Sequence, residues 1–409
     1  MALYLVGGFA LGVGLEFNAS AFWGVNLGLV IAVCAAFLCA WVSMAGSKYF
    51  PIFSFPAVVF CSVLIAWCVI SPLPTARLEG LPSTDRFNYY FVYYYPDIFS
   101  FSDQYEIGFL AFMSVARYFM SFQTFLVLCV CIALLGYLRM MAAAGAVRYF
   151  PFAVCLLIGY FSFWAGALNI TRQFLAGGVM LMGAAFILRT DKPDFRNHLM
   201  CAGFGIAATL IHSSAGLLFI FQAAMLLEKR ERTIIILWGI NFLAFIANFL
   251  EINPIRFVTG VVDRLQKYDV QQLSSNDLSY VISTGVGTGN RLDWAAFVLA
   301  PMFIYWFLVR SSKVGSGGDV KIRKFALFYT VIAMPFYNFS FLIYADRLAY
   351  FAFLAIPMFI LVLVGAPAMR SYRGAVLGML ACVAISQVAV GWYGYTPLNW
   401  ANGLQSGLR

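Results

Sequence analysis

The chain has 409 residues, of which 63% are hydrophobic, 18% are aromatic and only 11% are charged. Soluble globular proteins are about 45–50% apolar and about 25% charged, so this composition excludes a soluble enzyme, a disordered chain and a collagen-like protein. Apolar surface on this scale predicts a polytopic membrane protein. The formal net charge is +9, and its meaning depends on where the charges fall along the chain.

Apolar stretches with at most one charged residue, at or next to an end, mark the candidate membrane helices, because a span needs about 20 apolar residues. In chain order they are 3–17, 21–43, 51–71, 121–138, 149–168, 173–189, 198–211, 214–227, 233–250, 293–309, 325–345, 348–366 and 374–392. The sequence therefore predicts an all-α protein with about 11–13 transmembrane helices. We expect residues 1–409 to form a single transmembrane domain.

Lysine and arginine assign the two sides of the membrane. Sixteen of the 26 basic residues fall in one set of alternating connectors, and the positive-inside rule places that set in the cytoplasm. These connectors are short, so we expect no cytosolic domain that binds a nucleotide. The long connectors 72–120 and 251–292 lie on the opposite face, where we expect any chemistry to occur. The basic charge then reports topology and calls for no nucleic-acid partner.

Cysteine and histidine usage argues against a metal centre. All nine cysteines lie in apolar stretches, no CxxC occurs, and the chain has two histidines. Disulfide frameworks and zinc sites need cysteines or histidines grouped at ligand spacing. No DxD pair marks a divalent cation either. We therefore predict no metal and no cofactor.

The first long connector mixes charged side chains with aromatic rings. Asp85 and Arg86 open a run of tyrosines, and Asp103 and Tyr105 lie near its end. Carboxylates form hydrogen bonds with sugar hydroxyl groups, and aromatic rings cover the C–H faces of sugars. The combination therefore suits a carbohydrate ligand. Tyrosines also gather as a belt at the headgroup level of any membrane protein. Composition alone favours the belt and leaves both interpretations open.

Glu106 immediately precedes the apolar run Ile107 to Val115. This order places its carboxylate at the start of a helix, near the membrane surface. There it is either a first-turn acid that compensates the helix dipole or a general base.

Arg172 follows a short turn between two apolar stretches and is followed by Gln173. Asn169 or Thr171 can cap the next helix, which puts Arg172 in a first turn where the dipole disfavours a cation. An arginine at the bilayer centre costs about 2.5–3.5 kcal/mol on insertion scales. A bound anion explains the placement, because free N–H groups and a forked guanidinium form a phosphate site. Snorkelling to the interface is the alternative.

His212 interrupts the uncharged stretch Leu199 to Leu227. Both ends of that stretch face basic cytoplasmic connectors, so it must cross the membrane twice and turn near His212. A lone histidine is usually buried and hydrogen-bonded. At an outer turn it also suits proton transfer or a hydrogen bond to phosphate.

Two more arginines share the pattern of Arg172. Arg347 follows Asp346 at the start of an apolar stretch, with a local ion pair between the two as the alternative to a phosphate contact. Arg291 follows a glycine-rich segment, 285–289, which has neither a P-loop nor a dinucleotide fingerprint in context. We interpret that segment as a mobile loop that re-enters the membrane.

Four motifs, in this order, resemble the EpsG/Wzy-like family of bacterial O-antigen and exopolysaccharide polymerases. They are Glu106–Phe109, Arg172–Ala176, His212–Gly216 and Arg347–Phe351. Together they extend over about residues 100–351, the bulk of the chain.

The resemblance implies a GT-C-like glycosyltransferase in the bacterial inner (cytoplasmic) membrane, with the active site and both long loops facing the periplasm. In such a polymerase the growing glycan leaves undecaprenyl diphosphate and joins the non-reducing end of a lipid-linked repeat unit. The expected partners are the undecaprenyl-diphosphate-linked oligosaccharide, membrane lipid, a chain-length regulator and a flippase. An O-antigen ligase and a lipid-linked oligosaccharide flippase or transporter are the alternatives.

The site residues follow from the motifs together with the first loop. Glu106 and His212 are the expected catalytic residues. The expected diphosphate-binding residues are Arg172, Arg347 and Arg291, and the expected substrate-binding residues are Asp85, Arg86, Asp103, Tyr105 and Gln173.

Overall fold

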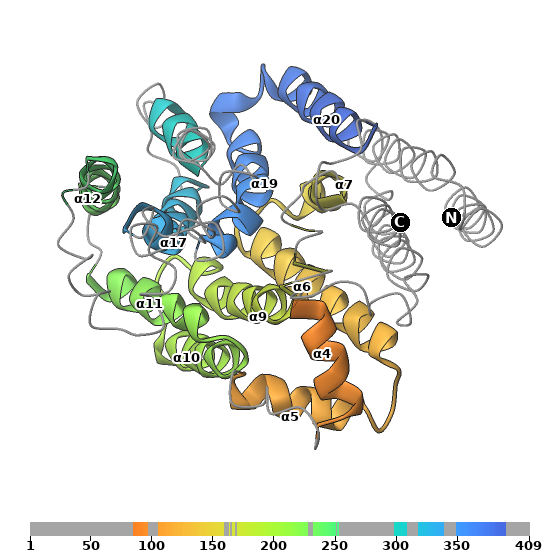
Figure 1. Ribbon diagram of the computed structural model, residues 1–409. Coiled ribbons are helices and arrows are strands. Elements are labelled where there is room, and N and C mark those ends of the chain that lie inside the picture. The colour runs from red at the N-terminus through yellow and green to blue at the C-terminus, as the bar shows by residue number, and fades with distance from the viewer. Residues whose placement is uncertain are drawn as a thin grey trace. The chain divides into compact units, whose positions relative to one another are not determined.

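The computed structural model describes residues 85–96, 105–158, 170–227, 232–250, 298–308, 318–338 and 349–389, and positions 163, 166, 167 and 252. Every regular element in these ranges is a helix, and none is a strand (Figure 1). Two helical segments of the same ranges are long and apolar enough to cross a membrane, Thr124–Ala143 and Thr171–Leu188, and five further apolar helices are shorter. The described part of the chain is therefore all-helical, and its apolar helices indicate a membrane protein.

The helices lie close to the predicted apolar stretches. Their bounds are α4 Asp85–Tyr94, α5 Ile107–Ala116, α6 Phe122–Ala143, η3 Val147–Tyr149, α7 Phe150–Ile158, α9 Thr171–Leu188, α10 Phe195–Ile211, η4 Ser213–Gly216, α11 Leu217–Leu227, α12 Arg232–Phe249, α17 Gly318–Asn338, α19 Tyr350–Val364, η6 Pro367–Met369 and α20 Arg373–Ala389. The predicted stretches 3–17, 21–43 and 51–71 lie outside the described residues, so the total number of spans stays a prediction.

Two details add to the predicted pattern. The connector 72–120 contains α5, the short helix predicted to follow Glu106, and also α4, which was not predicted. Helix α17 begins at Gly318, before the predicted start at residue 325, because the helical backbone continues through the charged residues of the preceding connector. The chain divides into one unit of residues 1–216 and 369–409 and a second unit of residues 217–368.

In the first unit, α9 packs against both α6 and α10 (Figure 1). A Cβ atom added at Gly136 of α6 would clash with the backbone of Gly178 of α9, so these helices meet backbone to backbone. The Arg139 guanidinium of α6 lies over the Phe186 ring of α9, at 5.8 Å. Along α6, Gly136 comes before Arg139, and along α9 their contact partners, Gly178 and Phe186, come in the same order. The two helices therefore run in the same direction.

Helix α4 is anchored by tyrosines. Tyr89 and Tyr93 are each 1% exposed, whereas Tyr94 and Tyr95 are more than 40% exposed. The Tyr93 hydroxyl donates to the Met120 carbonyl at 2.9 Å. Tyr89 and Tyr93 are therefore core residues, and the interpretations of this run as a lipid belt or a sugar platform are wrong for these two rings.

In the second unit, α12 and α17 are joined by side-chain amides. Asn241 donates to the Thr330 carbonyl at 3.3 Å, and Asn248 donates to the Tyr337 carbonyl at 2.6 Å. The two contacts advance by the same number of residues along both helices, so α12 and α17 run in the same direction. Helix α17 also packs against α11 and α19. These amides satisfy backbone carbonyls, an arrangement typical of helix association in membranes.

Candidate functional site

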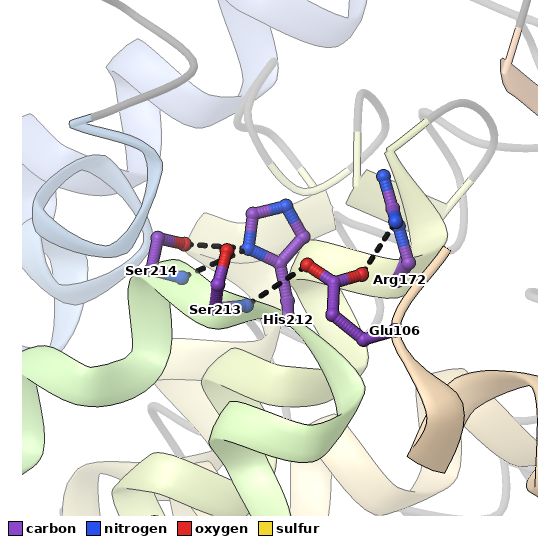
Figure 2. Close-up of polar contacts among 5 residues, drawn as sticks. All are labelled: Glu106, Arg172, His212, Ser213 and Ser214. Carbon is purple, nitrogen blue, oxygen red and sulfur yellow. Dashed lines mark hydrogen bonds and ion pairs between the residues drawn. The ribbon is translucent and has the colours of Figure 1, made fainter. Parts of the chain in front are cut away.

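Three helix ends supply the ionisable groups of the site. Glu106 is the N-cap residue of α5, Arg172 is the second residue of α9, and His212 is the C-cap residue of α10. The sequence predicted each of these positions: an acid at a helix start, an arginine in a first turn and a histidine at a turn. The tertiary structure adds that all three lie in one cluster (Figure 2).

Glu106 is held through both carboxylate oxygens. The Arg172 Nη1 atom donates to Oε2 at 2.5 Å, and the Ser213 N–H donates to Oε1 at 3.0 Å. Figure 2 shows the carboxylate lying between these two donors. Glu106 makes no side-chain cap hydrogen bond to α5. Its carboxylate therefore joins α9 to the turn after α10, a role that the helix-dipole interpretation does not include.

Aromatic rings support the Arg172 guanidinium. The Arg172 Cζ atom lies 4.8 Å from the centre of the Tyr105 ring, a cation–π distance, and the guanidinium also interacts with the side chain of Tyr89. Tyr89 in turn contacts the rings of Tyr105 at 5.4 Å and Phe109 at 5.3 Å. The Arg172 side chain is only 17% exposed. It is enclosed by partners, which disfavours the alternative of a freely snorkelling side chain.

The predicted cap of α9 is wrong. The N-cap residue is Ile170, which makes no side-chain cap hydrogen bond. Thr171 is already helical, and its hydroxyl donates backwards to the Ala167 carbonyl at 3.4 Å. No side chain from the cap residue accepts a hydrogen bond from the first N–H groups of α9. This helix start therefore keeps the backbone donors and the positive dipole end that attract an anion.

A glycine allows α5 to approach α10 closely. A Cβ atom added at Gly108 would lie 2.7 Å from the Leu210 carbonyl oxygen, far inside ordinary contact distance. Any side chain there would push the first turn of α5 away from the last turn of α10. Gly108 therefore helps to place Glu106 beside the Ser213 N–H.

His212 is anchored by the residue two positions later. The Ser214 N–H donates to His212 Nδ1 at 3.3 Å, and the Ser214 Oγ atom lies 2.6 Å from the same nitrogen. Burial, assisted by the nearby charge of Arg172 and opposed by Glu106, lowers the pKa of His212 to about 4. The imidazole is therefore neutral at pH 7.

Glu106 is ionised under the same conditions. Burial raises the pKa of Glu106, but the hydrogen bond from the Ser213 N–H and the charge of the Arg172 guanidinium outweigh it, so the pKa lies below the usual range. Both hydrogen bonds to the carboxylate favour its charged form. The cluster thus contains one carboxylate, one guanidinium and one neutral imidazole.

The other predicted site residues divide into three groups. Tyr105 joins the cluster, and Gln173 is 5% exposed in the first turn of α9. Asp85 and Arg86 begin α4, and their side chains lie outside what the structure describes. Asp103, Arg291 and Arg347 also lie outside the described residues, so their roles stay predictions.

Sequence reasoning missed three contributors, Tyr89, Ser213 and Ser214. The two serines directly follow His212, and that adjacency was the available signal, because a serine close to a histidine can hold its ring. Tyr89 left no such signal, since it is one of several tyrosines in α4 and only packing separates it from the rest. In the part of the chain that the structure describes, no three His, Cys, Asp or Glu residues gather as a metal site.

Comparison with known proteins identifies the family. The model of the EpsG family matches residues 62–400, a region that includes Glu106, Arg172 and His212. No curated protein and no solved structure matches the chain. Because the matched region covers most of the sequence, the chain belongs to the EpsG family.

Proposed function

We propose that this protein is a membrane glycosyltransferase that polymerises lipid-linked oligosaccharide repeat units into O-antigen or exopolysaccharide. Membership of the EpsG family indicates a polysaccharide polymerase-like function, and the apolar helices indicate a membrane protein. The observation that carries the proposal is the cluster of Glu106, Arg172 and His212 at three helix ends.

The proposed reaction transfers the growing glycan from one lipid to another. A hydroxyl oxygen at the non-reducing end of the incoming unit forms a bond to the anomeric carbon of the growing chain. The bond from that carbon to the undecaprenyl diphosphate breaks, and the diphosphate keeps the electron pair. The hydroxyl proton passes to a base in the site. Direct displacement of this kind inverts the anomeric centre.

Arg172 is the proposed contact to the diphosphate. A guanidinium has five N–H donors in a fixed fork; the ion pair with Glu106 engages one of its terminal nitrogens, and the Tyr89 side chain is a further partner. The start of α9 adds backbone N–H groups and the positive end of the helix dipole. Preorganised donors of this kind stabilise the charge that develops on a leaving group.

The charges of the cluster predict further cations. Glu106 and Arg172 offset one another and His212 is neutral, whereas a diphosphate carries several negative charges. Arg291 and Arg347, which the sequence analysis selected for the same task, are the proposed additional contacts. The proposal therefore requires at least one basic side chain beyond Arg172.

The two ends of α9 differ, and this supports chemistry at one membrane face. Arg172 lies in the first turn of the helix, and Arg189 is its C-cap residue, with the Arg189 guanidinium 5.5 Å from the Phe186 ring. Arg139 lies over the same ring. Arg139 and Arg189 are among the sixteen basic residues that the positive-inside rule assigns to the cytoplasm, so the Arg172 end is the proposed periplasmic end. Ionisable groups gathered there favour surface chemistry over alternating access, which needs groups near the midplane.

The test compares the two arginines of α9 in a repeat-unit assay with membrane-inserted protein. We expect Arg172→Ala to lower the polymerisation rate by about 10²–10³-fold, and Arg172→Lys to remain impaired because a point charge does not replace the fork. Arg189→Ala is the matched control on the same helix and should retain polymerisation.

The repeat-unit assay tests the proposed site, and assays of glycan delivery to lipid A core and of transport in liposomes separate the alternative functions. Polymer of normal length from Arg172→Ala would overturn the proposed site. Glycan delivered to lipid A core, without elongation, would identify a ligase. Lipid-linked units that cross liposomes of purified protein, again without elongation, would identify a flippase.

A further inference from the structure

His212 is held through one of its two ring nitrogens, and this determines where its proton lies. The Ser214 backbone N–H points to Nδ1 at 3.3 Å. A backbone N–H can only donate, so Nδ1 must accept. In a neutral imidazole one nitrogen accepts and the other carries the hydrogen. The remaining hydrogen of His212 is therefore on Nε2.

The Ser214 hydroxyl reinforces this assignment. Its Oγ atom lies 2.6 Å from the same Nδ1, close enough for a hydrogen bond in which the hydroxyl donates. Ser214 thus donates to Nδ1 of His212 through both its backbone N–H and its hydroxyl. Such an arrangement fixes both the tautomer and the orientation of a histidine ring.

We infer that Ser214 is a positioning residue that locks His212 in the Nε2–H tautomer, so that His212 acts as a neutral hydrogen-bond donor and not as the base. The identity of the group that receives this hydrogen bond, the departing diphosphate oxygen, rests on the proposed function. The tautomer itself rests only on the geometry around Nδ1.

A neutral donor suits the surroundings of His212. Arg172 contributes a positive charge to the same cluster, and a second cation beside it would be unfavourable. A neutral imidazole holds its Nε2 hydrogen tightly, so it stabilises growing negative charge without transferring a proton. Neutral imidazoles polarise oxygen atoms in this way when their surroundings keep the pKa low.

The acceptor proton then goes to Glu106. Its carboxylate is ionised and accepts from Arg172, from Ser213 and from its own backbone N–H, and two carboxylate oxygens have about four acceptor sites in all. The proton moves from the acceptor hydroxyl to a Glu106 oxygen while the new carbon–oxygen bond forms. Since the pKa of Glu106 is low, the proton transfers late, when the attacking oxygen has already become acidic.

The first experiment measures the tautomer directly in the full-length protein. The chain has two histidines, so His198→Gln leaves His212 as the single source of ring signals. In protein labelled with ¹⁵N-histidine, NMR at pH 7 should show an unprotonated Nδ1 and a protonated Nε2. A protonated Nδ1 would overturn the inference whatever the polymerisation activity.

The second experiment replaces the ring with an amide. Glutamine presents an N–H group near the place of Nε2 but cannot act as a base at neutral pH. We expect His212→Ala to lower the rate by about 10²-fold or more and His212→Gln to recover at least about tenfold of that loss, because the donor is restored. Equal losses in folded His212→Gln and His212→Ala would contradict a donor role.

The third experiment tests Ser214 itself. Ser214→Ala keeps the backbone donor but removes the hydroxyl, so Nε2–H should stay the main tautomer while a minor Nδ1–H form appears in the NMR spectrum. The rate should fall by about tenfold, the lower end of the loss seen when an outer partner of a metal-ligating histidine is removed. Ser214→Thr keeps the hydroxyl and should restore both measurements. Ser213→Ala keeps its backbone N–H and should leave the ring signals of His212 unchanged. A ring spectrum that is identical in Ser214→Ala and wild type would overturn the positioning role of the hydroxyl.

These measurements separate the two proposals. If wild-type protein makes no polymer but Nε2 carries the hydrogen, the proposed function fails and the tautomer stands. If polymer forms but Nδ1 carries the hydrogen, the proposed function stands and this inference fails.

Discussion

One polar cluster in the first unit and one in the second are buried in different ways, although the second unit also buries the charged Lys324 of α17. In the first unit, Glu106 and Arg172 are ionisable, partly exposed side chains that meet at helix ends. In the second unit, Asn241 and Asn248 are neutral and almost fully buried, and both donate to backbone carbonyls of α17. Polar composition is therefore not enough to identify a site in an apolar chain.

The difference has a physical basis. A neutral amide in an apolar interior is satisfied once it donates to a carbonyl, and it then has a structural role in holding helices together. An ion pair is expensive to bury and often contributes little net stability. Ionisable residues in membrane segments therefore mark functional positions by default. The contrast predicts that substitutions at the Glu106–Arg172 pair affect activity most, whereas those between α12 and α17 affect stability.

The largest expected effect is on activity, from Glu106→Gln. This change keeps the shape of the side chain but removes the proton acceptor and the charge that faces Arg172. We expect the polymerisation rate to fall by about 10²–10⁴-fold, measured on membrane-inserted protein that elutes as a single species in detergent. A rate within threefold of wild type would show that Glu106 is only a structural partner of Arg172.

The next effect is on packing, from Gly136→Leu. The side chain would have to enter the backbone contact between α6 and Gly178 of α9. We expect a loss of about 1–3 kcal/mol or more in the free energy of unfolding, seen as a lower melting temperature in detergent. Gly239, in α12, has nothing within 4 Å of an added Cβ atom, so Gly239→Ala is a control that should melt near wild type.

Acidification should destabilise the first unit in two steps. The pKa of His212 in the folded protein is about 4, below the unfolded value of about 6.5. The unfolded chain therefore binds more protons between these pH values, and stability falls as the pH drops from about 6.5 to 4. The lowered pKa of Glu106 acts in the same direction at lower pH, where stability is lost as the carboxylate protonates.

Thermal melts of the wild type and of His212→Gln would measure the first step, which the variant should lack. Polymerisation should likewise show no loss centred near pH 6.5. A loss of activity that follows an ordinary histidine titration would contradict a neutral His212. In Arg172→Ala the pKa values of both His212 and Glu106 should rise, because the positive charge that lowers them is gone.

A smaller effect sharpens the comparison in the second unit. Asn248→Leu removes the donor to the carbonyls of Tyr337 and Asn338 at the end of α17. Interhelical hydrogen bonds in membrane proteins contribute about 0.6 kcal/mol on average and up to about 1.7, and we expect a loss in this range. The rate per folded molecule should stay at the wild-type level. A large loss of rate at unchanged stability would show that Asn248 takes part in the reaction. The distinction between the ionisable cluster and the structural amides would then fail.

The smallest expected effect comes from the ring below Arg172. Tyr105→Phe keeps an aromatic face under the guanidinium and should retain most of the activity. Tyr105→Leu removes the cation–π contact, which contributes about 0.5–2 kcal/mol, and should lower the rate by about 2–30-fold. Rates for the two variants in the same assay check this, and equal rates would show that the ring has no role in holding Arg172.

The local sequence of apolar and polar residues determined the positions of most helices and of the residues at their ends. Apolar stretches located α6, α9, α10, α12 and α19 within a few residues, because the length and hydrophobicity of a span are properties of the segment itself. The same holds for Glu106, Arg172 and His212, since a residue next to an apolar run must lie at a helix end. The expectation that these residues belong to one site came from their order within a resemblance.

Only the tertiary structure decided how these residues meet. Ion pairing of Arg172 with Glu106 spans 66 positions, and the contact of Ser213 with Glu106 spans 107. Such contacts depend on how helices pack, here on the backbone approach at Gly108 and Gly178, and no local pattern encodes them. The burial of Tyr89 and Tyr93 was decided in the same way, because identical rings in one helix differ only in which neighbours they contact.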